Sequence, residues 1–168
     1  MKQLLLALFT LLVTTLFGQS STQIDSLTFC FNKYKVPTGC TAESEYQVKC
    51  DSYSITWLYM NEQMLQFMPD QFINQMAGQM KNFRKEPISC FLLDKEVKGY
   101  KISFKKDKGT GYQLVPYGVA NGQQVLVQLA LDNEPRTNED LPDFPRQNHS
   151  PGKITQQATL HLCNWGKH

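Results

Sequence analysis

The sequence has few groups that could act as an acid or a base near neutral pH. It contains only three histidines, His149, His161 and His168, all within its last twenty residues. No serine lies in a Gly-x-Ser-x-Gly motif, and no glycine-rich loop leads into a helix, so neither serine catalysis nor phosphate binding is indicated. His161, Cys163 and His168 match no zinc-ligand spacing. We therefore expect no catalytic residues, no metal and no cofactor.

Charge of either sign is also scarce. Charged residues make up 19% of the chain and the formal net charge is +2. A nucleic-acid-binding domain usually has a strongly basic face and a pI above about 9. The composition therefore argues against a nucleic-acid partner.

A long hydrophobic run occurs only at the N-terminus. Lys2 precedes an apolar stretch that extends to Phe17, and the small residue Gly18 follows. This pattern is typical of a secretory signal peptide, and the stretch is shorter than the roughly 20 residues of a spanning helix. We predict a signal peptide at residues 1–18, cleaved after Gly18 or, as a fallback, after Ser20. The mature protein would then be secreted or periplasmic, with no integral membrane segment; an uncut anchor is the alternative.

Five cysteines remain in the mature chain: Cys30, Cys40, Cys50, Cys90 and Cys163. An oxidising compartment favours disulfides, and an odd number leaves at least one thiol unpaired. We predict a Cys40–Cys50 disulfide, because a turn at residues 37–39 precedes it and the two cysteines flank an expected hairpin. Cys90 lies in an apolar run and is predicted to be a free, buried thiol, although Cys30 could equally enter a disulfide.

The clearest helix is predicted at residues 69–85. Pro69 suits the first helical position, and Asp70 follows in the first turn, where negative charge is favourable. Pro87 would end the helix. The expected core-facing set is Phe72, Ile73, Met76, Met80 and Phe83, and the basic residues of the last turn are Lys81, Arg84 and Lys85.

The segments around this helix have the pattern of β-strands. Residues 53–59 alternate between polar and apolar, and strands are also expected from residue 88 to 131, with turns at Lys98-Gly99 and residues 109–111. Asn121-Gly122 is a strong hairpin signal, because both central residues of a type I′ turn need positive φ. Residues 125–131 are apolar on both faces and predict a central strand.

The order of these elements predicts an α+β fold. We expect an antiparallel sheet of about five to seven strands, with the long helix and a short C-terminal helix at residues 138–144 packed on it. Residues 19–146 would form one domain, followed by an irregular tail at residues 147–168.

The succession from the Pro69 helix through the Asn121-Gly122 hairpin to the closing element at residues 138–144 resembles that of PsbP-like domains. The resemblance is one of element order over residues 45–147, without a diagnostic motif. It implies a small exported α/β/α module with a binding or assembly role rather than catalysis. Fold analogy alone does not decide function.

One hairpin concentrates positive charge. Tyr100, Ile102 and Phe104 should face the core, while Lys101 and Lys105 face outward. The hairpin could dock an acidic protein or an anionic envelope polymer, or its lysines could simply protect a sheet edge from aggregation. The lysines concerned are Lys95, Lys98, Lys101, Lys105, Lys106 and Lys108.

These observations favour a secreted or periplasmic binding or assembly module, such as an inhibitor or immunity-type protein. The alternative is a small secreted hydrolase with an unrecognised active site. A deep cleft with converging polar groups would favour the hydrolase.

Overall fold

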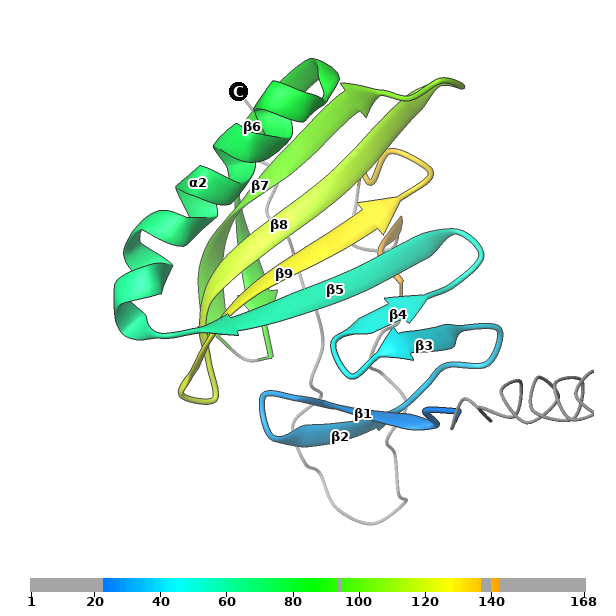
Figure 1. Cartoon of the computed structure of the whole chain (residues 1–168), viewed down its shortest axis with the longest axis vertical. Coiled ribbons are helices and arrows are strands. Elements are labelled where there is room, and N and C mark those ends of the chain that lie inside the picture. The colour runs from blue at the N-terminus through cyan, green and yellow to red at the C-terminus, as the bar shows by residue number, and fades with distance from the viewer. Residues whose placement is uncertain (1–22, 94, 137–139, 143–168) are drawn as a thin grey trace, which may run out of the picture.

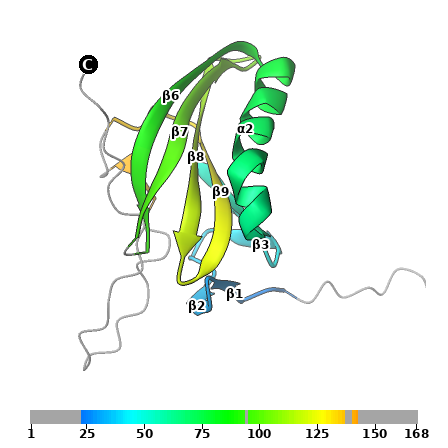
Figure 2. The same cartoon turned by 90° about the vertical axis from the view of Figure 1, so that its left-hand side faces the viewer.

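The computed structural model describes residues 23–93, 95–136 and 140–142 (Figure 1). Seven strands form one antiparallel sheet in the order β3-β4-β5-β9-β8-β7-β6, and β1 and β2 form a separate hairpin. One helix, α2, packs on one face of the sheet (Figure 2). The fold is thus mainly antiparallel β with one helix, and the expected number of sheet strands is confirmed.

The bounds of the elements follow the chain from one end to the other. The strands before the helix are β1 (Ser26–Phe29), β2 (Asn32–Lys35), β3 (Thr41–Ser44), β4 (Gln47–Lys49) and β5 (Tyr53–Met60). The helix α2 (Glu62–Gln79) follows, and then β6 (Lys81–Leu92), β7 (Lys95–Lys105), β8 (Thr110–Ala120) and β9 (Gln123–Leu131).

Strand β9 lies at the centre of the sheet, between β5 and β8. Its Val125, Val127 and Leu129 belong to one buried cluster, whereas Leu126 belongs to a second cluster with Ile73 of α2. Alternate residues of a strand point to opposite faces, so the sheet has a core on each side. The prediction of a central strand covered on both faces is confirmed.

The helix begins earlier than predicted. Asn61 is the N-cap, and its side chain accepts a hydrogen bond of 2.8 Å from the Met64 N–H. Pro69 lies inside the helix, where the loss of its N–H and its steric clash cost about 3 kcal/mol, but it is fully buried. Burial against the sheet and the Asn61 cap outweigh the local preference, so the predicted start at Pro69 is wrong.

The helix also ends earlier, at Gln79. Met80 has an extended backbone, β6 begins at Lys81, and Asn82 within that strand has φ of +53°. The expected basic last turn is therefore wrong, since Lys81, Arg84 and Lys85 all lie in β6. Pro87 lies in the same strand, at the edge of the sheet, where a missing N–H is tolerated.

The short C-terminal helix expected at residues 138–144 is not seen in the described part of the chain. Only residues 140–142 of that segment are described, and they include Pro142, which has no N–H to donate to a helical hydrogen bond. The predicted signal peptide at residues 1–18 and the tail at 147–168 lie outside the described residues. Within those described, no helix is long and apolar enough to cross a membrane.

Two turn predictions had different outcomes. Asn121 and Gly122 have φ of +47° and +76° and join β8 to β9 as a two-residue turn, so that prediction is confirmed. Lys98 and Gly99, by contrast, lie within β7. A Cβ at Gly99 would come within 2.8 Å of the Pro116 Cα. The glycine therefore allows β7 and β8 to approach closely and does not form a turn.

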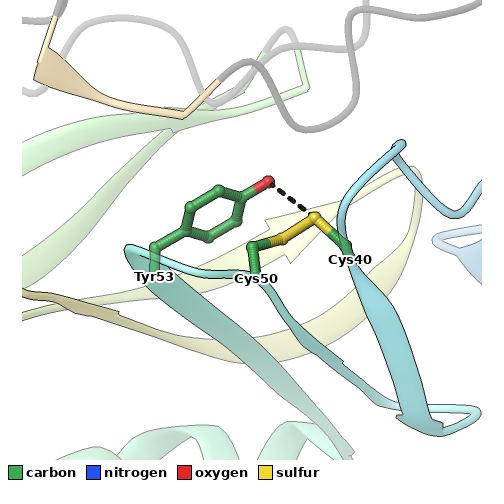
Figure 3. Close-up of a disulfide and its surroundings, with 3 residues drawn as sticks. All are labelled: Cys40, Cys50 and Tyr53. Atoms are coloured by element: carbon green, nitrogen blue, oxygen red, sulfur yellow. Dashed lines mark hydrogen bonds between the residues drawn. A yellow bond between two sulfur atoms is a disulfide. The ribbon is translucent and has the colours of Figure 1, made fainter.

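The Cys40–Cys50 disulfide is present, with Cα atoms 4.2 Å apart (Figure 3). It closes the open end of the β3–β4 hairpin. The Tyr53 hydroxyl donates to the Cys40 Sγ over 3.7 Å, since a disulfide sulfur carries no proton. Closing a loop of this size contributes about 3 kcal/mol in the chain-entropy model. The disulfide is compatible with an oxidising, exported location.

The prediction for Cys90 is wrong. Cys90 is disulfide-bonded, whereas Cys30 is free and buried. An apolar sequence context indicates burial but does not distinguish a buried thiol from a buried disulfide. The free thiol of the described chain is Cys30.

We expect two glycine substitutions to have opposite effects. Gly99→Ala should lower the free energy of unfolding by about 2 kcal/mol, because its Cβ meets backbone that can move only if the sheet shifts. Gly78→Ala should raise it by about 0.5 kcal/mol, because Gly78 is helical with open space around it and alanine is the better helix former. Urea unfolding monitored by circular dichroism measures both; equal effects would contradict the close approach at Pro116.

Candidate functional site

The site best suited to a ligand is an aromatic-lined cavity of about 370 Å³ at one end of the sheet. It lies between β1, the tip of the β3–β4 hairpin, and the adjoining ends of β5 and β9. This cavity is called the aromatic hollow below. Its lining residues are Ser26, Leu27, Thr28, Phe31, Glu45, Tyr46, Tyr59 and Gln123.

The β3–β4 hairpin places Glu45 and Tyr46 at the hollow. These two residues form its turn, while the disulfide ties its other end. The Tyr46 ring makes edge-to-face contacts with Trp57 at 6.4 Å and with Tyr59 at 6.2 Å, and Trp57 in turn contacts Phe29 at 5.6 Å. Each such pair adds about 0.5–1.5 kcal/mol beyond its area burial. A chain of four rings therefore joins the lining of the hollow to the buried core.

The β1–β2 hairpin contributes the opposite side. Leu27, Phe29 and Tyr34 pack into the core cluster on the sheet face opposite α2. Its turn consists of Cys30 and Phe31, with φ of +46° and +68°. Positive φ is rare for bulky residues, and the equivalent turn between β8 and β9 uses Asn-Gly instead.

Two hydrogen bonds hold this strained turn on the sheet. The Cys30 N–H donates to the Tyr59 hydroxyl at 2.7 Å, and the Asn121 side-chain amide donates to the Cys30 carbonyl at 3.2 Å. The Cys30 side chain is buried, whereas Phe31 is 72% exposed. The turn therefore presents a large apolar ring to solvent at the rim of the hollow.

The groups beneath the hollow are neutral at physiological pH. Burial raises the pKa of the Cys30 thiol to about 11 and that of the Tyr34 hydroxyl to about 12, and it also raises the pKa of Tyr59. The lining itself includes one ionisable carboxylate, Glu45, and none of the described lining residues is a histidine, lysine or cysteine. Such a surface suits an aromatic or apolar group that carries a positive charge.

Sequence reasoning did not find this site. Cys30 and Phe31 carry no turn signal, since neither is a residue type typical of turns. Tyr46 and Tyr59 belong to elements that were predicted, but their convergence with β1 depends on how the hairpin packs. No local signal in the sequence indicates that packing.

The structure separates the six predicted lysines. Tyr100, Ile102 and Phe104 pack in the cluster beneath α2, as expected. Lys95 and Lys105 occupy opposite ends of β7, about 33 Å apart at 3.3 Å per residue. Lys98 is exposed on the strand, and Lys106 and Lys108 lie in the turn before β8.

Lys101 was expected to face solvent, but it does not. Its side chain is only 13% exposed, and its Nζ donates to the Glu134 Oε1 at 2.8 Å and to the Pro135 carbonyl at 3.2 Å. The hydrogen bond from Lys101 is the main cause that lowers the pKa of Glu134. Lys101 thus holds the segment after β9 against β7.

Two of the remaining lysines border a broad, mixed basin of about 870 Å³ at the β7–β8 turn. Lys105 and Lys106 share it with Arg84, but three acidic residues line it too. Lys106 pairs with Asp132 at 3.3 Å. Because positively and negatively charged side chains are mixed in this basin, its net electrostatic potential attracts an acidic partner only weakly. A docking role for the other lysines, Lys95, Lys98, Lys105, Lys106 and Lys108, stays a prediction.

Comparison with protein-family models finds no match for this sequence, and comparison with curated proteins finds none either.

We expect Lys101 and Lys105 to differ sharply on charge reversal. Lys101→Glu should lower the free energy of unfolding by about 2 kcal/mol, because it places a second carboxylate beside Glu134 in a half-buried position. Lys105→Glu, at an exposed position, should change it by less than about 0.5 kcal/mol. Urea denaturation compares the two variants. A neutral Lys101→Glu would show that the ion pair does not hold the segment.

Cys30 should resist alkylation in the folded protein. With its pKa raised to about 11, about one thiol in a thousand is ionised at pH 8, and the side chain is buried as well. Iodoacetamide at pH 8 should label Cys30 at least a hundredfold more slowly in buffer than in 6 M urea without reductant. Mass spectrometry of digested protein measures the rates, and fast native labelling would contradict the burial of the hairpin turn.

Proposed function

We propose that this chain is an exported binding module and that the aromatic hollow is its ligand site. The observation that carries the proposal is Phe31, a 72% exposed ring held at positive φ at the rim of the hollow. A left-handed conformation costs about 1–2 kcal/mol for a residue with a Cβ. Strained backbone of this kind clusters at active sites and ligand clamps.

The composition of the hollow supports binding of an aromatic group with an attached cation. Tyr46 and Tyr59 offer ring faces and edges for stacking, and Tyr46 is itself 48% exposed. Glu45 lies among them, and no ion pair to it occurs in the described part of the chain. The volume falls within the range of about 300–1,000 Å³ typical of ligand sites.

The predicted PsbP-like element order implies the same class of role, binding or assembly, and the predicted secreted or periplasmic location is compatible with it. An inhibitor or immunity-type protein is one form that it could take. The hydrolase alternative draws no support from the hollow, because among the described residues no hydrogen bond joins Ser26 or Thr28 to Glu45, the one carboxylate of the lining.

The test uses benzamidine, which combines an aromatic ring with a positive charge, and benzoate, which has the opposite charge. In two-dimensional NMR, benzamidine should shift the Tyr46 and Tyr59 ring signals at millimolar concentration, and benzoate should bind at least fivefold more weakly. Glu45→Gln should abolish this preference. If neither compound shifts the two tyrosines, the hollow is not a site for aromatic ligands.

The Phe31→Gly variant separates a functional from a structural role. Glycine suits positive φ, so we expect the stability to stay unchanged or to rise by up to about 1 kcal/mol, while benzamidine binds at least threefold more weakly. Phe29→Ala is the matched comparison, because it removes a buried ring and should destabilise the fold by about 3 kcal/mol. A stability loss for Phe31→Gly would show that Phe31 is structural.

A further inference from the structure

One edge of β1 faces the hollow and is unpaired within the described residues. The register Phe29↔Asn32 flanks a two-residue turn, and Val36 donates to the Asp25 carbonyl at 2.9 Å. In an antiparallel pair, residues bonded to the partner alternate with residues whose backbone groups point away. The N–H and C=O groups of Ser26 and Thr28 therefore point away from β2.

These outward groups have no strand to bond within the described chain. There, β1 pairs with β2 alone, and no backbone–backbone hydrogen bond joins it to another strand. Ser26, Leu27 and Thr28 themselves line the hollow. A ligand in the hollow thus lies beside two backbone donors and two backbone acceptors.

The other exposed edges are guarded in ways that the β1 edge is not. The edge strand β6 carries Pro87 among several charged side chains, and its pairing with β7 is irregular after Lys81. The edge strand β3 has an irregular register between Ala42 and Ser44. Such features block the addition of a further strand, whereas Ser26 and Thr28 are small and uncharged.

From this geometry, and resting on the proposed function, we propose that the ligand is an extended peptide segment of a partner protein that adds as a strand to the free edge of β1. Two of its residues, spaced by two, exchange four hydrogen bonds with Ser26 and Thr28. In strand addition, main-chain hydrogen bonds provide the affinity, and pockets for alternate side chains provide the specificity. Charge complementarity identifies the peptide: an aromatic side chain enters the hollow, and a lysine or arginine two residues away lies beside Glu45.

The probe is the peptide acetyl-Thr-Lys-Val-Phe-Val-Lys-Thr-amide, in which both lysines share a face with the phenylalanine. Bound to the full mature chain, it should slow amide hydrogen exchange of Ser26 and Thr28 at least tenfold and shift the Tyr46 and Tyr59 ring signals. A peptide with alanine in place of phenylalanine should bind at least tenfold more weakly.

Two N-methylated peptides provide the decisive comparison. Only alternate N–H groups of an added strand face its partner. Methylation of the phenylalanine nitrogen in one peptide and of the following valine nitrogen in the other should therefore weaken binding at least tenfold in one case and less than threefold in the other. Equal effects would overturn strand addition.

The chain offers a matched pair of variants at the same edge. Thr28→Pro removes the outward N–H and leaves the bonds to β2 intact, and should weaken peptide binding at least fivefold. Thr28→Val keeps the N–H and should bind as the unaltered protein does. If Thr28→Pro does not fold, the methylated peptides still decide the question.

The failures of the two proposals can be told apart. A peptide that shifts Tyr46 and Tyr59 without protecting the Ser26 and Thr28 amides would overturn strand addition and leave the aromatic hollow as the site. Failure of benzamidine to shift the tyrosines would instead overturn the hollow. A concentration-dependent dimer abolished by Thr28→Pro would replace the peptide partner with a second copy of this chain.

Discussion

Strand β9 pairs with β5 along eight residues, from Tyr53↔Leu131 to Met60↔Gln124. This pairing joins the strands that precede the helix to the β6–β9 meander that follows it. Because β9 is apolar on both faces, it completes the cluster under α2 and the cluster on the other face together. Such long-range pairing costs loop-closure entropy before it gains contacts, so the fold depends on the burial that β9 provides.

The hollow depends on how the β1–β2 hairpin packs against this sheet. The hairpin buries its apolar side in the cluster that β9 completes, and its turn is tied to Tyr59 of β5 and to Asn121 beside β9. The disulfide holds the facing β3–β4 hairpin. Two hairpins anchored to adjacent strands thus enclose the hollow, and the strain at Cys30 and Phe31 is maintained by the contacts around it.

Local patterns were informative where one interaction dominates. Asn121-Gly122 formed the expected turn because positive φ is its main requirement, and the two-sided apolar run at residues 125–131 could be satisfied only at the centre of a sheet. The helix start was mispredicted because Pro69 has a strong local preference that tertiary burial overrides. Gly99 was mispredicted because a glycine can serve a close strand approach as well as a turn.

The sequence by itself determined the α+β class, the central strand, the β8–β9 turn and the Cys40–Cys50 pair, since each depends on neighbours close along the chain or on a hydrophobic pattern. Only the tertiary structure decided which lysines are exposed, that Lys101 pairs with Glu134, and that Phe31, Tyr46 and Tyr59 meet at one hollow. These facts depend on contacts between segments far apart in sequence. A residue pattern does not show which distant segments will come into contact. The free edge of β1 likewise becomes visible only when every strand has been paired.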